Sequence, residues 1–386
     1  MVIINGKIFP MEGTSIDCGY VRTKGRFIEE VGPMTSFEEK ENEGTILDVQ
    51  GAWVLPGLIE PHAHIGITEE KWGAIGDDCN EETEPVTPWL RAIDAVNPMD
   101  PAFHDAIEAG ITSVMTGPGS ANVVGGQFVF MKTQGRCVDS MVVKEPAAMK
   151  VAFGENPKTT YGDKDQYPST RMGTAALLRK ALYQAAQYKK DKESGKLEKE
   201  DFQMEPWLPV LERKIPLKAH AHRADDILTA IRIAKEFHVD ITIDHGTESH
   251  LIVDEVKAAG FPVIVGTDLT SRSKLEVQNM NFKTNKILHE AGVLFGITTD
   301  HPVALIQYLS LCAGLAVKHG LPVEEGLKAI TIYAARICRV DDRVGSLKKG
   351  KDADIAVFSG NPMEVFTKTL YTIIDGQLVY ENHECK

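Results

Sequence analysis

Histidines in this sequence occur in short patterns that could bind a metal ion. Residues 54–64 read Val-Leu-Pro-Gly-Leu-Ile-Glu-Pro-His-Ala-His, so one residue separates His62 from His64. Side chains two positions apart on an extended strand point to the same face, which would place the two imidazoles side by side. Imidazole is a ligand for zinc, iron and nickel. A single His-x-His pair also arises by chance, so further ligands are needed before it indicates a metal site.

Three later segments supply further candidates, each after a short apolar run. The segment 218–222 reads Lys-Ala-His-Ala-His, the segment 241–245 ends in Asp-His, and the segment 297–300 reads Ile-Thr-Thr-Asp. Taken singly, a histidine could be buried and hydrogen-bonded, and Asp300 could cap the helix expected from Pro302. Their recurrence at strand ends favours a metal site instead. The five candidate ligands are His62, His64, His220, His245 and Asp300.

The segments that would position these ligands alternate between strand and helix patterns. The eight predicted strands cover residues 53–59, 111–115, 141–143, 149–153, 216–219, 240–243, 262–265 and 293–297. Helical periodicity covers 171–188, 225–237, 252–259, 304–319 and 324–337. Such alternation predicts an α/β fold with a parallel sheet, and eight units predict a TIM (β/α)8 barrel. Residues 116–140 fit poorly, because loop and irregular strand stand where a helix is expected.

In a barrel of this kind the carboxyl ends of the strands meet on one face, where active sites form. The five candidate ligands follow four predicted strands and should therefore converge. The charged residues 189–201 carry both signs mixed, which indicates a solvated helical extension without a function of its own.

Both ends of the chain are rich in short strand patterns with glycine turns, such as Asn5-Gly6 and Asp375-Gly376. Neither end is large enough to bury a core alone. We therefore expect a small composite β-sandwich domain from residues 1–52 plus 340–386, attached to a barrel of residues 53–339.

Composition excludes several classes of protein. The 386 residues carry a net charge of −13, which argues against nucleic acid or an anionic membrane as partner. No apolar run approaches a membrane span, the start of the sequence lacks a signal peptide, and the six cysteines are scattered. We expect a cytoplasmic enzyme with reduced thiols and a small-molecule substrate, and the sequence leaves both a monomer and a homo-oligomer open.

The order of these motifs resembles the amidohydrolase superfamily of metal-dependent hydrolases over nearly the whole chain. The supporting matches are residues 54–64, the histidines at 220 and 245, Thr299-Asp300-His, and Val344-Gly-Ser-Leu-Lys-Lys-Gly-Lys-Asp-Ala-Asp-Ile-Ala-Val. The sequence looks most similar to the branch that contains imidazolonepropionase-like and prolidase-like hydrolases. The resemblance implies the same barrel and composite β domain that the strand patterns predict.

The resemblance also implies roles for the candidate ligands. His62 and His64 would bind a buried metal ion with Asp300, and His220 and His245 a second ion. A carboxylated Lys150 would bridge the two ions, with Glu155 as the alternative bridging ligand; if neither serves, the site holds one ion. Zinc is the expected metal, with iron, manganese or nickel as alternatives.

The reaction implied is hydrolysis of a C–N bond in an amide, N-acyl, dipeptide or cyclic amide substrate. Metal-activated hydroxide would attack the carbon, and Asp300 would act as general base and then general acid. The alternatives are deamination of a ring substrate with one metal, and a barrel that serves as a scaffold without catalysis.

Substrate contacts are less specific in the sequence. Arg171 could bind a substrate carboxylate with Tyr161 nearby, or could instead tie its loop to a neighbouring carboxylate. His222 could face the substrate or pack in the core. His301 and Arg272 are weaker candidates of the same kind. Glu60 is expected to orient a ligand histidine, or to form a buried ion pair.

Overall fold

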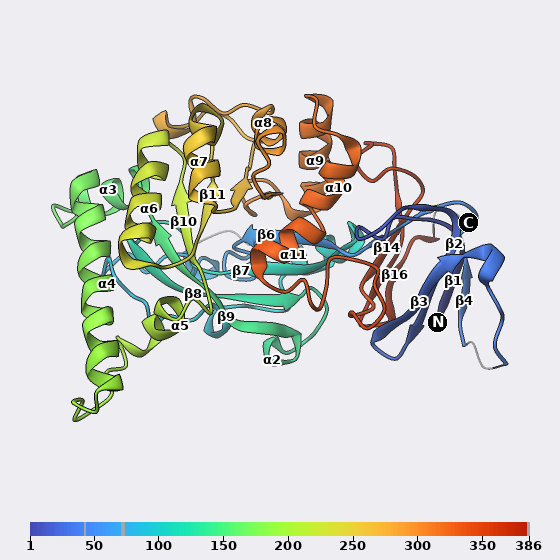
Figure 1. Ribbon diagram of the computed structural model, residues 1–386, viewed down its shortest axis with the longest axis horizontal. Helices are drawn as coiled ribbons and strands as arrows, with labels where there is room; N and C mark the ends of the chain where they lie inside the picture. Colours follow the sequence, from blue (N-terminus) through green and yellow to red (C-terminus); the bar gives the residue numbers. More distant parts are fainter. Residues whose placement is uncertain (42–43, 71–73, 384–386) are drawn as a thin grey trace.

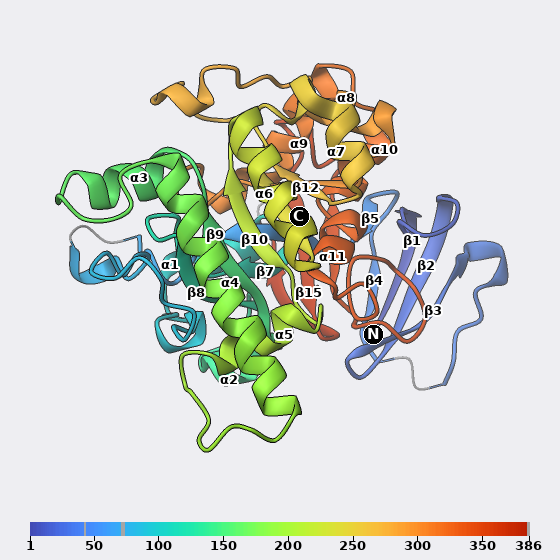
Figure 2. The same cartoon turned by 60° about the vertical axis from the view of Figure 1, so that its left-hand side comes forward.

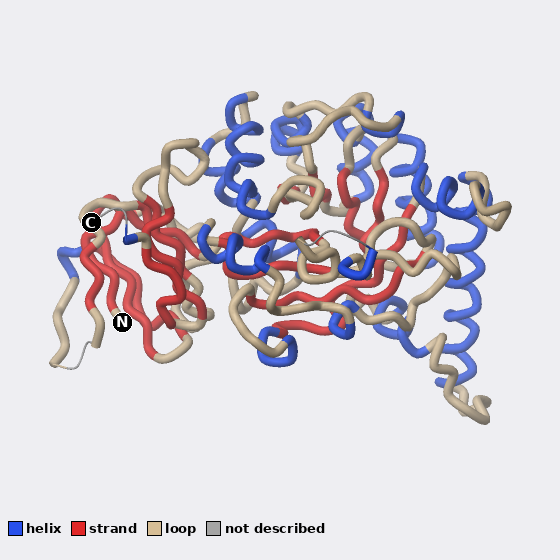
Figure 3. Tube along the Cα trace, turned by 180° about the vertical axis from the view of Figure 1, so that it is seen from behind, coloured by secondary structure: helices blue, strands red, loops and turns tan. Residues whose placement is uncertain are grey.

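The computed structural model describes residues 1–41, 44–70 and 74–383, and its strands form two eight-stranded sheets. One sheet curls into a barrel with helices around it, and the other lies at one end of the molecule (Figure 1). Viewed from behind, the strands fall into these two groups, and the markers of both chain ends lie beside the second sheet (Figure 3).

The barrel sheet runs in chain order from β6 to β13. Its strands are β6 (Leu58–Ala63), β7 (Ile111–Thr116), β8 (Val124–Lys132), β9 (Val142–Ala152), β10 (Leu217–Ala221), β11 (Ile241–His245), β12 (Val263–Val265) and β13 (Phe295–Ile297). The two edges approach each other where the His64 amide donates to the His301 carbonyl at 2.9 Å. The barrel is therefore nearly closed, which confirms the TIM-like fold.

One strand of the barrel runs against the others, which corrects the expectation of eight parallel strands. β8 pairs antiparallel with both β7 and β9. It occupies the segment 116–140 that fitted poorly, and the two strands predicted at 141–143 and 149–153 are one strand, β9. Gly126 has a φ of 124° and lies where the register shifts, so β8 begins with a bulge. Because Gly125 and Gly126 interrupt the strand pattern, β8 was not recognised in the sequence.

The predicted strand 53–59 is also two strands. β5 (Trp53–Pro56) belongs to the terminal sheet and β6 begins the barrel, with Gly57 between them. A side chain at this glycine would lie 2.1 Å from Thr112 Oγ1, so only glycine fits. The chain thus passes from one sheet into the other across one residue.

Helices cover the outside of the barrel, as Figure 2 shows for α4, α6 and α7. The helices are α1 (Pro101–Glu108), α2 (Val138–Met141), α3 (Glu155–Gly162), α4 (Arg171–Glu193), α5 (Leu208–Leu211), α6 (Ala224–Phe237), α7 (Val253–Ala259), α8 (Thr284–Ala291), α9 (Leu309–Lys318), α10 (Val323–Ala329) and α11 (Ile332–Cys338). α6 buries Ile227, Ile231 and Ala234 at the predicted helical spacing. The predicted helix 324–337 is broken into α10 and α11.

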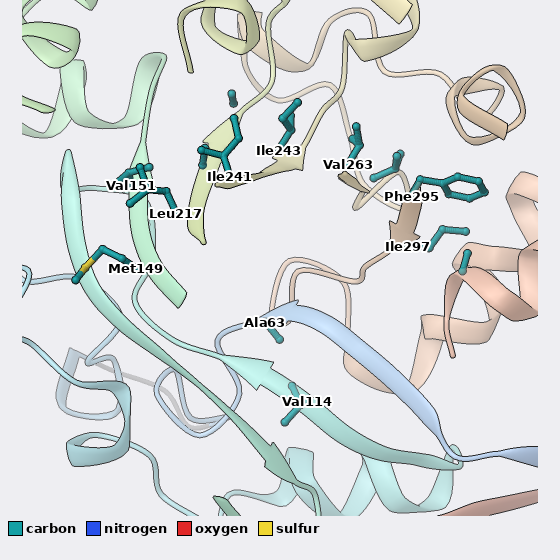
Figure 4. Packing of buried hydrophobic residues seen from close by; sticks show 14 of the residues in the cluster. Ala63, Val114, Met149, Val151, Leu217, Ile241, Ile243, Val263, Phe295 and Ile297 are labelled. Atoms are coloured by element: carbon teal, nitrogen blue, oxygen red, sulfur yellow. The ribbon is translucent and has the colours of Figure 1, made fainter. Parts of the chain in front are cut away.

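Apolar side chains from successive barrel strands fill the core that supports the ligand-bearing strand ends. Val151, Leu217, Ile243 and Val263 are at most 1% exposed and belong to one cluster (Figure 4). Burial of this kind stabilises the fold by about 1.5–3 kcal/mol per large aliphatic side chain. No helix in the described ranges is long and apolar enough to cross a membrane.

The terminal sheet takes strands from both ends of the chain, in the order β16-β15-β14-β5-β1-β2-β3 with β4 paired to β1. Its strands are β1 (Val2–Ile8), β2 (Ile16–Lys24), β3 (Phe27–Pro33), β4 (Ile46–Asp48), β5, β14 (Ile355–Phe358), β15 (Thr369–Ile374) and β16 (Gln377–Glu381). β5 and β14 pair antiparallel, which joins the two ends. Ile3, Val21 and Val357 share one buried cluster. The domain limits stated above stay a prediction.

Candidate metal centre

Five histidines and Asp300 meet at the carboxyl-terminal ends of the barrel strands: the four candidate histidine ligands and His222. His62 lies on β6, His220 is the last residue but one of β10, His245 ends β11, and Asp300 follows β13. Their ligand atoms form two groups, and within each group all atoms lie within 4.8 Å of one another. We call His62, His64 and Asp300 the first cluster, and His220, His222 and His245 the second cluster.

In the first cluster both imidazoles face one carboxylate oxygen. Asp300 Oδ1 lies 3.6 Å from His62 Nε2 and 3.4 Å from His64 Nε2. Lys150 Nζ lies 3.3 Å from His62 Nε2, and its side chain is fully buried. Burial lowers the pKa of Lys150 to about 8, against the opposing effect of Asp244 and Asp300. Lys150 therefore stands beside the first cluster.

The second cluster includes His222 beside the two predicted ligands. The rings of His222 and His245 are stacked with centroids 4.6 Å apart and planes 12° apart. His220 meets both rings edge-on, at 4.7 Å and 4.5 Å. Asp300 Oδ2 lies 3.9 Å from His245 Nδ1, so the aspartate stands between the two clusters. The structure thus places His222 with the candidate metal ligands.

The outer nitrogen of each of four rings lies against a polar atom behind the ring: those of His64, His222 and His245 are hydrogen-bonded, and that of His62 lies close to a carboxylate. The contacts of Nδ1 are those of His62 with Asp244 Oδ2 (3.0 Å), His64 with the Gly117 carbonyl (2.7 Å), His245 with the Gly266 carbonyl (2.7 Å) and His222 with Thr247 Oγ1 (2.7 Å). An imidazole that donates from Nδ1 to a carbonyl or carboxylate keeps the lone pair of Nε2 for a metal ion. This second layer orients the rings as a metal site needs.

His220 gives the most direct test of whether the residues fit a cation. It is 3% exposed, and neither of its ring nitrogens has a hydrogen-bond partner. Buried polar atoms are almost always paired, so an imidazole with two unpaired nitrogens among other imidazoles fits a metal ligand. The donor set of imidazoles and one carboxylate suits a divalent ion such as zinc.

Burial also favours the neutral form of the rings, which is the form that binds metal. It lowers the pKa of His62, His220, His222 and His245 well below the ordinary value. His64 differs: burial acts to lower its pKa, but the nearby Cys79 and Asp300 raise it to about 10.

Two residues of the centre have left-handed backbone conformations. His245 has a φ of 70° and Asp300 a φ of 54°, values that side chains with a Cβ rarely adopt. Thr298 Oγ1 accepts from the Asp300 amide at 2.9 Å and holds this turn. Strain of this kind gathers at functional sites, where the surrounding structure enforces it.

Glu155 lies outside both clusters. It begins α3, where its Oε2 accepts from the Glu276 amide at 3.3 Å, and its own amide donates to Glu276 Oε2 at 3.0 Å. Of the two candidate bridging ligands, the structure brings Lys150 to the first cluster and pairs Glu155 with a neighbouring loop.

The predicted substrate contacts do not gather at the centre. Arg171 Nε binds the Asp226 carboxylate at 3.1 Å, which is the loop-tying alternative considered above. Tyr161 is fully buried and donates to Asn122 Oδ1 at 2.6 Å. His301 is also buried, and its Nδ1 accepts from a backbone amide. Arg272 donates to the Met280 carbonyl. The geometry therefore gives no support to a role of these four residues in substrate binding.

Glu60 and Asp244 share the orienting role that was expected of Glu60 alone. Glu60 accepts from the Thr299 amide at 2.8 Å and from both threonine hydroxyls, so it holds the turn that precedes Asp300. Asp244 is the carboxylate that contacts the His62 ring. Alternation along β11, with Thr242 and Asp244 on one face, was the available signal for it.

A cavity of about 330 Å³ opens over both clusters. It is lined by His64, His220, His222, His245 and Asp300, and by residues that sequence reasoning missed, among them Cys79, Asn80, Asn156, Ser273 and Lys274. Ser273 and Lys274 lie in the loop after β12, and their place at a strand's carboxyl end was the signal that could have found them.

Comparisons with known proteins agree with this architecture. The family model described as "Amidohydrolase family" matches residues 210–379. A crystal structure of an amidohydrolase from Thermotoga maritima MSB8 is 41% identical, covers 99% of this chain and 100% of its own, and has a TM-score of 0.95. The amidohydrolase tasK of Hapsidospora irregularis is 26% identical over 97% of this chain and 42% of its own length.

An imidazolonepropionase of Mesorhizobium japonicum is 22% identical over 89% of this chain and 87% of its own length. The chain spans about half the length of the first curated relatives it matches. With the barrel and its ligand-bearing strand ends, these matches show that the chain belongs to the amidohydrolase superfamily.

Proposed function

We propose that this protein hydrolyses a C–N bond of a small amide-type molecule, an N-acyl, dipeptide or cyclic amide substrate. The observation that supports this most directly is the position of Asp300. Its carboxylate faces His62 and His64 at 3.6 and 3.4 Å, lines the cavity, and is 15% exposed. A carboxylate so placed reaches both a metal site and a substrate.

The two clusters would hold one or two divalent cations, with zinc expected first. A cation bound there would lower the pKa of water and polarise the substrate oxygen. With two cations, Lys150 would serve as the bridge after carboxylation, because it is the buried lysine beside His62 Nε2. The neutral amine that carboxylation needs is favoured by the burial that lowers the pKa of Lys150.

Asp300 would move the proton. Burial acts to raise its pKa, but His245 and His64 hold that pKa below the ordinary value, so the carboxylate is ionised at neutral pH. It can accept a proton from the attacking water and return it to the leaving nitrogen. Its strained backbone and the Thr298 contact fix the carboxylate between the clusters for this transfer.

The test is metal analysis followed by a substrate screen. The protein, loaded with zinc, is assayed for amine release from N-acyl amino acids and Xaa-Pro dipeptides and for ring opening of cyclic ureides, with Asp300→Asn as the paired variant. Hydrolysis that depends on metal and on Asp300 supports the proposal. Ammonia release from ring substrates by a protein with one metal per chain would favour the deaminase instead. Absence of metal binding would favour the scaffold.

A further inference from the structure

Lys274 brings a positive charge to the wall of the cavity. It is the one Lys or Arg that lines this cavity among residues 1–41, 44–70 and 74–383. It precedes the short 3-10 turn Leu275–Val277 in the loop between β12 and α8. None of the roles assigned above uses it.

Two contacts hold the ammonium group in place. Lys274 Nζ lies 2.5 Å from Glu276 Oε1 and donates to Asn156 Oδ1 at 3.0 Å. An ammonium group has three N–H donors, so these contacts leave one donor for a ligand. The side chain is 34% exposed and lines the cavity, while Glu276 is buried, so a ligand in the cavity can reach the ammonium.

Hydroxyl groups line the same cavity as this ammonium. Thr270, Ser271 and Ser273 line the cavity from the same loop, and Ser120 lines it beside Asn156, whose Nδ2 donates to Ser120 Oγ at 2.7 Å. A cavity that offers an ammonium and hydroxyl donors suits an anionic oxygen group, because charge-assisted hydrogen bonds are the stronger ones.

The charge balance favours a group with a single negative charge. Glu276 already neutralises part of the charge on Lys274, and Asp77 and Asp300 also line the cavity. A dianion such as a phosphate ester would meet more repulsion than a carboxylate.

The position of Lys274 relative to the second cluster indicates how far a bound carboxylate would lie from the candidate metal ligands. Glu276 Oε1 lies 3.7 Å from His220 Nε2 and 3.7 Å from His222 Nε2, and the same oxygen contacts Lys274. A single carboxylate oxygen therefore separates the ammonium from the imidazoles. This separation suits a substrate whose carboxylate lies a few bonds from the scissile amide, as in an α-amino acid.

We propose that the substrate carries a carboxylate that Lys274 binds, so that the protein acts on N-acyl amino acids or dipeptides. This inference rests on the proposed C–N hydrolysis and adds the substrate class. Lys274 acts in specificity, because it binds a part of the substrate away from the scissile bond.

The experiment compares each N-acetyl amino acid with its C-terminal amide, which differs only by the charge. Wild-type protein should favour the acid in kcat/KM by roughly 10- to 100-fold, the value of a hydrogen bond to a charged group. Lys274→Met should lose this preference mainly through a higher KM for the acid, and Lys274→Arg should keep much of it. Lys283→Met, which removes an exposed lysine from the same loop, should behave as wild type.

Loss of activity toward acid and amide alike in Lys274→Met, with the metal content of wild type, would overturn the inference. A phosphorylated amide that is a better substrate than the acid would also overturn it. Calorimetric titration with the acid and the amide needs no turnover, and equal affinities for wild type would count against the carboxylate site. Equal hydrolysis of acid and amide contradicts this inference alone, whereas absence of any C–N hydrolysis contradicts the proposed function.

Discussion

His62 Nδ1 lies 3.0 Å from Asp244 Oδ2, and both side chains are fully buried at the base of the metal centre. Thr242 donates to Asp244 Oδ1 at 2.8 Å, and Lys218 Nζ lies 3.4 Å from the same oxygen. Thr242 and Lys218 therefore hold the Asp244 carboxylate in position, and the carboxylate in turn orients the His62 imidazole. The ligand face of His62 depends on residues that never touch the cavity.

Asp244→Asn should weaken metal binding while the barrel stays folded. The amide can donate to Nδ1, which would move the ring proton to Nε2 and remove the lone pair that binds the ion. We expect metal affinity to fall roughly 10- to 100-fold, measured by competition with a chelator. Asp254→Asn, an exposed carboxylate on α7, is the control. Equal affinity in both variants would show that Asp244 does not orient His62.

Lys150→Met should reduce the number of metal ions per chain. Lys150 is the buried lysine beside the first cluster, 3.3 Å from His62 Nε2, and a thioether cannot be carboxylated. Elemental analysis of wild type loaded with zinc and bicarbonate should give about two ions per chain, and the variant about one. A variant that keeps the wild-type content would remove Lys150 from the bridging role.

Lys132→Met should destabilise the junction between the barrel and the terminal sheet. Lys132 ends β8 and contacts Asp352 at 3.0 Å and Asp354, and all three side chains are at most 4% exposed. Removing the cation leaves the buried Asp354 carboxylate without a cation, whereas Asp352 keeps Arg343, so the free energy of unfolding should fall by about 3–5 kcal/mol. Lys164→Met, which breaks an exposed pair with Glu82, should change it by at most about 1 kcal/mol. Denaturant titration of both variants measures the difference.

The stability that Lys132 contributes should depend on pH in the alkaline range. Burial acts to lower the pKa of Lys132, but Asp354 and Asp352 raise it above the ordinary value of 10.5. Its contribution to stability is therefore fully present below pH 10.5 and is lost as the pH rises through the folded-state pKa. The stability difference between wild type and Lys132→Met should be constant from pH 7 to 9 and shrink above pH 10.5. A difference that shrinks already between pH 7 and 9 would contradict this assignment.

The convergence of the candidate ligands could be predicted because its signal is local. His62, His220 and His245 lie near the ends of short apolar strands and Asp300 follows one, and the carboxyl ends of barrel strands share one face. The antiparallel β8 could not be predicted in this way, because the bulge at Gly126 interrupts the pattern of its strand.

The wall of the cavity depends on contacts between distant loops, which local patterns do not contain. Lys274 lines the cavity because Asn156 and Glu276 hold it there, and Arg171 points elsewhere because Asp226 binds it. In the sequence Lys274 is a single charge in a loop and Arg171 a single charge at the start of a predicted helix, and neither pattern names the partner.

Amine release by the Asp300→Asn variant is the most direct test of metal-dependent hydrolysis with Asp300 as the proton carrier. The variant should bind as much metal as wild type, because an amide oxygen can replace the carboxylate oxygen near His62 and His64, while kcat falls by about 100- to 10,000-fold, as expected for a lost general base. An Asp300→Asn protein that carries the wild-type metal content and releases amine at the wild-type rate would contradict the account.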